Sequence, residues 1–211
     1  MDERALQQRE RRALCDTLEA VGGDAPTMCD GWDAHDLAAH LVVRERDPWT
    51  APVIICGVLN GVIHRMTVSE KGRGFPAVVA RLRNGPPWLF RATPAIARLN
   101  AVEDWIHHED VRRAQPGWER RAMGGEMDDV LWRGVGAAGK VAATRLDGVA
   151  LDVVAPDGRR RTLGGHRNVV EVHGEPGEIL RFVTGRTTSS EVELRGSDDA
   201  VDRVRRSGLR L

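Results

Sequence analysis

The stretch "AVEDWIHHEDVRR", residues 101–113, combines acidic, imidazole and apolar side chains in a segment with the hydrophobic period of an α-helix. Glu103 and His107 are four residues apart, so their side chains lie on the same face of such a helix. A carboxylate and an imidazole one turn apart can bind a divalent metal together, and they can equally form an ion pair. The rest of the chain is needed to choose between these two interpretations.

Helix boundary signals place this segment within a long helix. Thr93 is a predicted N-cap, Pro94 suits the first helical position, and the helix should run to Ala114, before a Gln-Pro-Gly sequence. Upstream, amphipathic patterns and turn-forming residues predict further helices. These cover residues 3–21, 33–47, about 49–66 and 75–83, with Asp33 as the N-cap of the second. We therefore expect a helical bundle over residues 1–120.

The sequence pattern changes after residue 125. A helix that contains several glycines is expected over residues 127–145, and beyond it the hydrophobic period shifts from 3.6 to 2, which is typical of strands. The Asp-Gly pair at 157–158 predicts a hairpin turn. The expected strands are 149–156, 159–165, 168–174 and 190–196, and the expected helices are 175–186 and 197–208, opened by Pro176 and Ser197. The predicted fold class is α+β: a four-helix bundle followed by a small α+β domain at 125–211.

Composition excludes several classes of protein. The 31 basic and 31 acidic residues are interspersed and give no net charge, which argues against nucleic acid as a partner. No apolar run approaches the roughly 18 residues of a membrane span, and the charged first residues do not resemble a signal peptide. We therefore expect a cytoplasmic protein with no membrane partner. The 29 arginines against 2 lysines indicate GC-rich codons and hence a high-GC bacterium.

The three cysteines, Cys15, Cys29 and Cys56, are too few and too widely spaced to predict a disulfide framework or a zinc site made of cysteines alone. We expect Cys29 to pack beneath Trp32, because no base stands near it in the sequence to activate its thiol.

The segment "GVGAAG", residues 134–139, fits the G-x-G-x-x-G pattern of dinucleotide-binding proteins. The preceding residues read as helix rather than strand, and the related phosphate-loop pattern fails at Val141, where a hydroxyl is required. We therefore reject a nucleotide site and expect a helix of small residues that packs closely against the bundle.

His40 is the second candidate ligand from the bundle. Leu37 and Leu41 lie on nearly the same helical face, so the imidazole should point into the interior, as His107 and Glu103 should. Burying Glu103 without a partner would cost ~3 kcal/mol or more, and a cation relieves that cost. Two histidines and one glutamate match a catalytic zinc site with an open fourth position, although Fe²⁺ and Ni²⁺ accept the same donors.

The other polar residues near these ligands have simpler predicted roles. His108 and Glu109 are rotated away from His107 and should face solvent, a second shell or the partner domain. Asp110 either orients the His107 ring or forms a surface ion pair with Arg112 or Arg113. His35 is expected at the surface, and the remaining histidines, His64, His166 and His173, are expected to be structural.

Three segments together resemble a known family. "TMCDGWDAHDLAAHLV" (27–42), "VEDWIHHEDVRRA" (102–114) and "VHGEPGEILRFVTGR" (172–186) are similar to motifs of the mycothiol-dependent maleylpyruvate isomerases, a branch of the DinB-like metal-binding bundles. The resemblance implies a DinB-like bundle followed by a sterol-carrier-like domain and an actinobacterial source. It also implies His40, Glu103 and His107 as metal ligands, and a Gly185–Arg186 pair whose guanidinium binds an anion.

The same resemblance implies an activity. A divalent metal, Zn²⁺ first among the candidates, would activate the thiol of mycothiol for isomerisation of, or transfer to, an electrophilic small-molecule substrate, in a monomer or homodimer. Two other interpretations stay open: a non-catalytic metal-binding module, such as a thiol-stress or sensor protein, and a metal-free interaction protein in which Glu103 and His107 form a buried ion pair.

Overall fold

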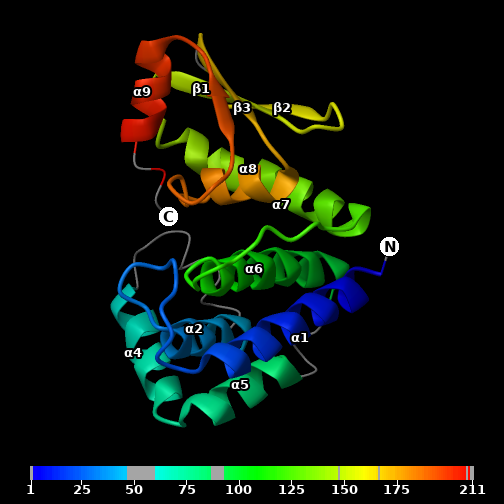
Figure 1. Ribbon diagram of the computed structural model, residues 1–211, viewed down its shortest axis with the longest axis vertical. Coiled ribbons are helices and arrows are strands. Elements are labelled where there is room, and N and C mark those ends of the chain that lie inside the picture. Colours follow the sequence, from blue (N-terminus) through cyan, green and yellow to red (C-terminus); the bar gives the residue numbers. More distant parts are fainter. Residues whose placement is uncertain are drawn as a thin grey trace. The chain divides into compact units, whose positions relative to one another are not determined.

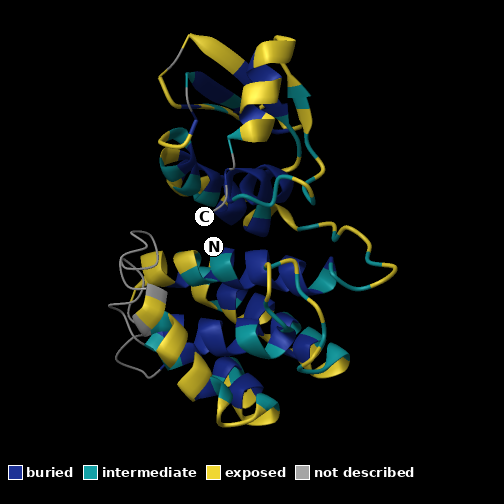
Figure 2. Cartoon of the chain, turned by 90° about the vertical axis from the view of Figure 1, so that its left-hand side faces the viewer, coloured by how far each residue is buried: buried dark blue, intermediate teal, exposed yellow. Residues whose placement is uncertain are grey.

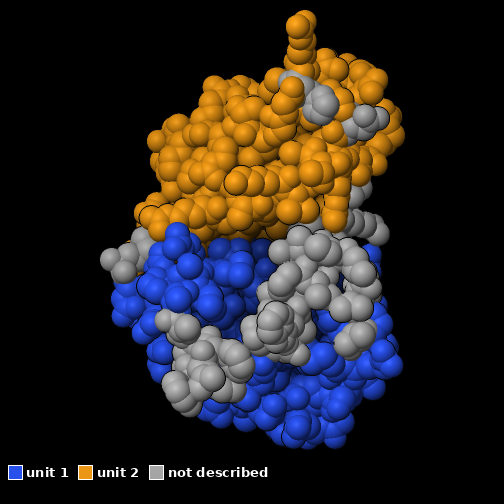
Figure 3. Space-filling view, turned by 180° about the vertical axis from the view of Figure 1, so that it is seen from behind, with its two compact units in different colours: residues 1–121 blue, residues 122–211 orange. Residues whose placement is uncertain are grey.

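A computed structural model describes residues 2–46, 60–86, 93–146, 148–165, 167–207 and 209. The chain divides into two compact units, residues 1–121 and 122–211 (Figure 3). Some predictions fall outside the described residues: Cys56, His166, the helix end at Gly208 and most of the helix expected at 49–66. The described part of that helix belongs to α4, Asn60–Lys71.

The described part of the first unit is helical, and its boundaries follow the predicted signals. Its helices are α1 (Glu3–Val21), α2 (Ala34–Arg46), α4, α5 (Phe75–Asn84) and α6 (Pro94–Arg112). The Thr93 hydroxyl accepts a hydrogen bond from the backbone N–H of Ile96, which caps α6 as expected. Asp33 and Asp36 each accept a hydrogen bond from the other's backbone N–H, and this reciprocal pair caps α2.

The helices of the first unit pack around an apolar core (Figure 1). Helix α1 lies beside α5 and α6, and α2 packs on α4 and α5. The faces that meet carry the buried residues, whereas the outward faces are exposed (Figure 2). The fully buried side chains of this core come mainly from α1, α2 and α5 and include Leu14, Leu18, Leu37, Leu41, Val78, Val79 and Leu82.

The second unit contains a four-stranded sheet with helices packed on it. Its elements are α7 (Gly125–Ala143), β1 (Val149–Val154), β2 (Arg160–Leu163), β3 (Asn168–His173), α8 (Pro176–Val183), β4 (Glu193–Arg195) and α9 (Asp198–Arg206). The strand order is β2-β1-β3-β4, in which β1 and β3 are parallel and both outer pairs are antiparallel. The predicted hairpin joins β1 to β2, and the predicted α+β class is confirmed.

The "GVGAAG" segment lies in α7, so the predicted helix of small residues is confirmed. A Cβ atom at Gly136 would lie against the Arg161 guanidinium, and one at Gly139 would lie 2.5 Å from Leu163 Cδ1. Both neighbours belong to strand β2 of the same unit, so these small residues allow close packing of the helix on the sheet.

No helix among the described residues is both long and apolar enough to span a membrane.

Gly139→Val should destabilise the second unit. The new side chain would begin 2.5 Å from Leu163, and overpacking of this kind costs about 1–3 kcal/mol. Urea unfolding measures the loss, with Gly125→Ala, at an open position at the start of α7, as the matched control. In a Leu163→Ala background most of the loss should disappear, and a Gly139→Val protein as stable as the wild type would contradict the packing described.

Candidate metal centre

The loop before α2 is anchored on α6. The backbone N–H of Met28 donates to the Asp110 carbonyl at 2.9 Å, and the Trp32 N–H donates to the Cys29 carbonyl at 3.0 Å, which closes a tight turn. Gly31 lies at φ +76° in that turn, a conformation that favours glycine. This turn brings Cys29 and Trp32 next to helices α2 and α6.

His40 lies in the interior of α2, with 9% of its surface exposed. Its ring contacts the Trp32 ring on one side, at 4.9 Å between centroids, and the His107 ring on the other, at 5.8 Å. Burial, reinforced by the neighbouring His107, lowers the pKa of His40 to about 3. The ring is therefore neutral at physiological pH and keeps a nitrogen lone pair that can coordinate a metal.

The two nitrogens of His107 face two different carboxylates. Nε2 lies 3.8 Å from Glu103 Oε2, and Nδ1 lies 3.2 Å from Asp110 Oδ2. Burial opposes the charged ring, but the hydrogen bond to Asp110 and the neighbouring Cys29 raise the pKa of His107 to about 9. In the molecule without a metal, an imidazolium at His107 therefore balances the adjacent acidic groups.

Glu103 is less buried than predicted and already has a basic partner. Its side chain is 29% exposed, and Oε2 lies 3.5 Å from Arg44 Nε. The expected cost of an unpaired buried carboxylate therefore does not arise, so burial alone does not require a cation at Glu103.

A second set of possible ligands shares His107. Among the residues that the structure describes, the group whose donor atoms all lie within 4.8 Å of one another is Cys29, His107 and Asp110, without His40 or Glu103. The Cys29 thiol donates to Asp110 Oδ2 at 3.4 Å and lies 4.0 Å from His107 Nδ1. Cys29 packs against the apolar core, and although no base is near it in the sequence, the fold brings His107 and Asp110 next to its thiol. The two sets use opposite edges of one imidazole ring.

Asp110 is buried and its carboxylate contacts the His107 ring, which is the first of its two predicted roles. Arg112 and Arg113 each donate to the Glu109 carboxylate at 2.8 Å.

His108 and Glu109 do not face solvent, which was one of the three environments predicted for them. They are 3% and 1% exposed and face α1 within a network of ion pairs. His108 Nδ1 lies 2.7 Å from Glu10 Oε1, and Arg121 donates to both Glu10 and Glu109 at 2.8 Å. These hydrogen bonds outweigh burial and lower the pKa of Glu10, so it stays ionised. Sequence spacing predicted that these two side chains point away from the face that carries His107. It did not indicate which helix covers them.

Three further described histidines belong to neither ligand set. His35 is half-buried instead of exposed, with its ring 5.5 Å from that of Phe75. His64 is exposed on α4, and His173 pairs with Glu171 at 2.8 Å on β3.

Arg186, the candidate anion-binding residue, belongs to the second unit. It follows Gly185, which lies at φ +92° just after α8, and its backbone N–H donates to the Arg181 carbonyl at 2.9 Å. Its own carbonyl accepts hydrogen bonds from the Ser189 and Ser190 side chains, and Nη1 donates to the Thr184 carbonyl. The turn that carries Arg186 is therefore stabilised by several hydrogen bonds.

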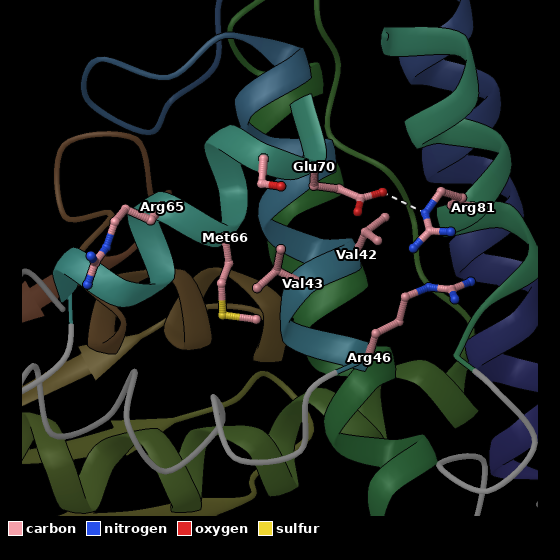
Figure 4. A pocket seen from close by; sticks show the side chains of 8 residues that line it. Val42, Val43, Arg46, Arg65, Met66, Glu70 and Arg81 are labelled. Carbon is pink, nitrogen blue, oxygen red and sulfur yellow. Dashed lines mark hydrogen bonds and ion pairs between the residues drawn. The ribbon is translucent and has the colours of Figure 1, made fainter. Parts of the chain in front are cut away.

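The first unit also has a hollow of about 450 Å³ on another face of α2 (Figure 4). Val42, Val43 and Arg46 line it from α2, while Met66 and Glu70 line it from α4. Glu70 pairs with Arg81 at 2.6 Å across it. The residues that line it include none of the candidate ligands.

A buried acid pair that sequence reasoning missed lies between α1, α2 and α6. Glu45 and Asp104 share the Arg11 guanidinium, and Gln7 donates to Asp104 at 2.8 Å. Burial, then the Asp104 carboxyl, raises the pKa of Glu45 to about 8, against the opposing effect of Arg11 and Arg44. Helical spacing places Asp104 on a different face from Glu103. No local sequence pattern indicates that Asp104 and Glu45 both contact Arg11.

Neither the protein-family models nor the curated proteins include a match to this sequence. Two solved structures share its fold: a crystal structure of the mycothiol-dependent maleylpyruvate isomerase and one of its variant with a histidine replaced by alanine. Their TM-scores are 0.65 and 0.63, each at 16% identity and covering 92% of both chains. At this identity the likeness concerns the fold, and it confirms at that level the resemblance predicted from the three motifs.

Glu45 should make the metal-free protein less stable as the pH rises. An acid with a pKa of about 8 when folded, against its ordinary 4.5, binds more protons in the folded state between those values, so the free energy of unfolding falls across that interval. We expect a slope of up to about 1.4 kcal/mol per pH unit, measured by urea unfolding with a chelator present.

Glu45→Gln should reduce this slope and leave the part that His107, with its raised pKa of about 9, contributes above pH 6.5. Glu19→Gln, at an exposed acid of α1 that pairs with Arg83, should leave the slope unchanged. An undiminished slope in Glu45→Gln would show that Glu45 is not a source of it.

Proposed function

We propose that this protein is a mycothiol-dependent isomerase or thiol transferase in which His40, Glu103 and His107 bind a divalent metal, Zn²⁺ first among the candidates. The fold likeness supports the class of reaction. The observation that supports the site most directly is the orientation of the His107 ring.

The His107 ring is held as metal-binding histidines usually are. Such a histidine uses one ring nitrogen for the metal and donates the other to a carboxylate, which fixes the ring orientation. Asp110 occupies that position at Nδ1, so Nε2 is left on the side of Glu103. Two ligand atoms of a tetrahedral zinc lie about 3.4 Å apart, and the observed Nε2–Oε2 separation of 3.8 Å is close to this value.

The chemical types of the three donors suit a divalent cation, and binding one would require them to move closer together, because the described group with all donor atoms within 4.8 Å of one another does not include His40 or Glu103. His40 contributes a neutral imidazole from the facing helix, and Glu103 contributes one carboxylate, which gives the two-histidine, one-acid composition of catalytic zinc sites. When bound, such a cation lowers the pKa of a thiol from about 8.5 to below neutrality, which makes the thiolate available. The Trp32 ring lies against His40, with 4.9 Å between the ring centroids.

Arg186 is proposed to bind a carboxylate of the electrophilic substrate. A guanidinium binds a carboxylate through two parallel hydrogen bonds, and the bonded turn after Gly185 restricts its position. Because the reaction needs a reduced small thiol, we place the protein in the cytoplasm, as a monomer or homodimer.

Metal content distinguishes the two ligand sets. His40 belongs to one set and Cys29 to the other, so His40→Ala should lose bound metal and thiol-dependent turnover, whereas Cys29→Ala should keep close to one metal per chain. Elemental analysis of protein never exposed to chelator gives the stoichiometry, and transfer of mycothiol to a model electrophile gives the activity.

The opposite pattern, in which Cys29→Ala loses the metal and His40→Ala keeps it, would assign the site to Cys29, His107 and Asp110. A wild-type protein without metal would overturn the proposal. Stoichiometric metal without thiol-dependent turnover would leave the non-catalytic metal-binding module.

Arg186→Ala should lower kcat/KM for a carboxylate-bearing electrophile by roughly 10- to 100-fold, which corresponds to the loss of one charged hydrogen-bonded contact. The metal content should not change. Arg195→Ala removes another arginine of the second unit, one that pairs with Glu193 at the surface, and serves as the matched control. Equal effects of the two substitutions would contradict a substrate-binding role for Arg186.

A further inference from the structure

Arg44 occupies the same face of α2 as the proposed ligand His40, one helical turn further along. Its side chain is 7% exposed, which is unusual for a charged group without a function or a partner. Across from it, Asn100, Glu103 and His107 follow one another on a single face of α6, at spacings of three and four residues.

The Arg44 guanidinium contacts two of these α6 residues at once. Nη1 donates to Asn100 Oδ1 at 3.2 Å, and Nε lies 3.5 Å from Glu103 Oε2. The Glu103 oxygen near Arg44 is also the one that lies 3.8 Å from His107 Nε2. A single carboxylate oxygen is therefore located between a guanidinium on one helix and an imidazole on its own helix.

Glu103 needs such a contact to have a defined orientation. Its side chain is 29% exposed and has three rotatable bonds, so in the absence of a partner it would sample several rotamers in water. The Arg44 side chain has much less conformational freedom, because it is buried and its hydrogen bond to Asn100 fixes one edge of the planar guanidinium. Arg44 therefore orients the Glu103 carboxylate.

We propose that Arg44 is a positioning residue, which orients the Glu103 carboxylate toward His107 and His40 before a metal arrives. This inference rests on the function proposed above, because it assigns Glu103 as a ligand. A residue of this kind contributes to metal affinity without touching the metal, and removing it typically weakens binding 10- to 100-fold.

The planar shape of the guanidinium matters as much as its charge. A lysine ammonium at position 44 would keep the positive charge but cannot present two fixed N–H groups to Asn100 and Glu103 together. Arg44→Lys should therefore bind metal more weakly than the wild type and more tightly than Arg44→Met.

The test is a titration of the full-length, chelator-treated protein with Co²⁺, followed by absorbance, which reports both affinity and coordination. Arg44→Met should raise the Kd 10- to 100-fold, and Arg46→Met should change it less than threefold. Arg46 is a matched control because it lies on the same helix but lines the hollow and donates to the Gly85 carbonyl (Figure 4).

A double-mutant cycle separates positioning from a general structural role. In a Glu103→Gln background, where two imidazoles remain, Arg44→Met should change the Kd less than threefold. An equal loss in both backgrounds would show that Arg44 only links the helices, and would overturn the inference. Circular dichroism checks the fold of each variant, and Arg44→Lys provides the same comparison if Arg44→Met fails to fold.

The outcomes for the wild type distinguish this inference from the proposed function. Equal Co²⁺ affinity in the wild type and the Arg44 variants overturns the role of Arg44 alone. Failure of the wild type to bind Co²⁺ overturns both.

Discussion

The imidazole of His107, with a carboxylate near each of its two nitrogens, is the constraint on which the rest of the site depends. A buried imidazole needs a partner for each nitrogen, and here α6 itself supplies both, Glu103 one turn before and Asp110 almost one turn after. The ring is therefore fixed by local helical geometry alone. What the tertiary structure adds is the set of neighbours that reach each edge: Cys29 beside Nδ1, and His40 facing the ring from α2.

Much of this arrangement was predictable because it depends on local rules. Caps and turn residues define where α2, α6 and α9 begin, since a hydroxyl or carboxylate at the first position satisfies free backbone N–H groups whatever the rest of the chain does. Helical periodicity likewise places Glu103 and His107 on one face and His40 on an inward face. The α+β class followed from the change of period after residue 125.

The partners of charged residues were not predictable, because they depend on contacts between distant segments. His108 meets Glu10, 98 residues away, and Cys29 meets Asp110, 81 residues away. With 31 basic and 31 acidic residues, each charge has many candidate partners, and no local pattern selects among them. The exposure of Glu103 was misjudged for the same reason, since its partner Arg44 comes from another helix.

The buried charges between α1 and α6 have a bearing on the site through the register of these helices. An apolar interface tolerates small rotations, whereas a buried ion pair that loses its partner is destabilised by roughly 3–5 kcal/mol. Glu10 of α1 lies against His108 of α6, and Arg121 donates to both Glu10 and Glu109, so a rotation of α6 against α1 would break several such contacts together. His107 is the next residue to His108. On the hypothesis that buried ion pairs specify register, the charged face of α6 therefore fixes the direction in which its adjacent ligand face points, toward α2 and His40.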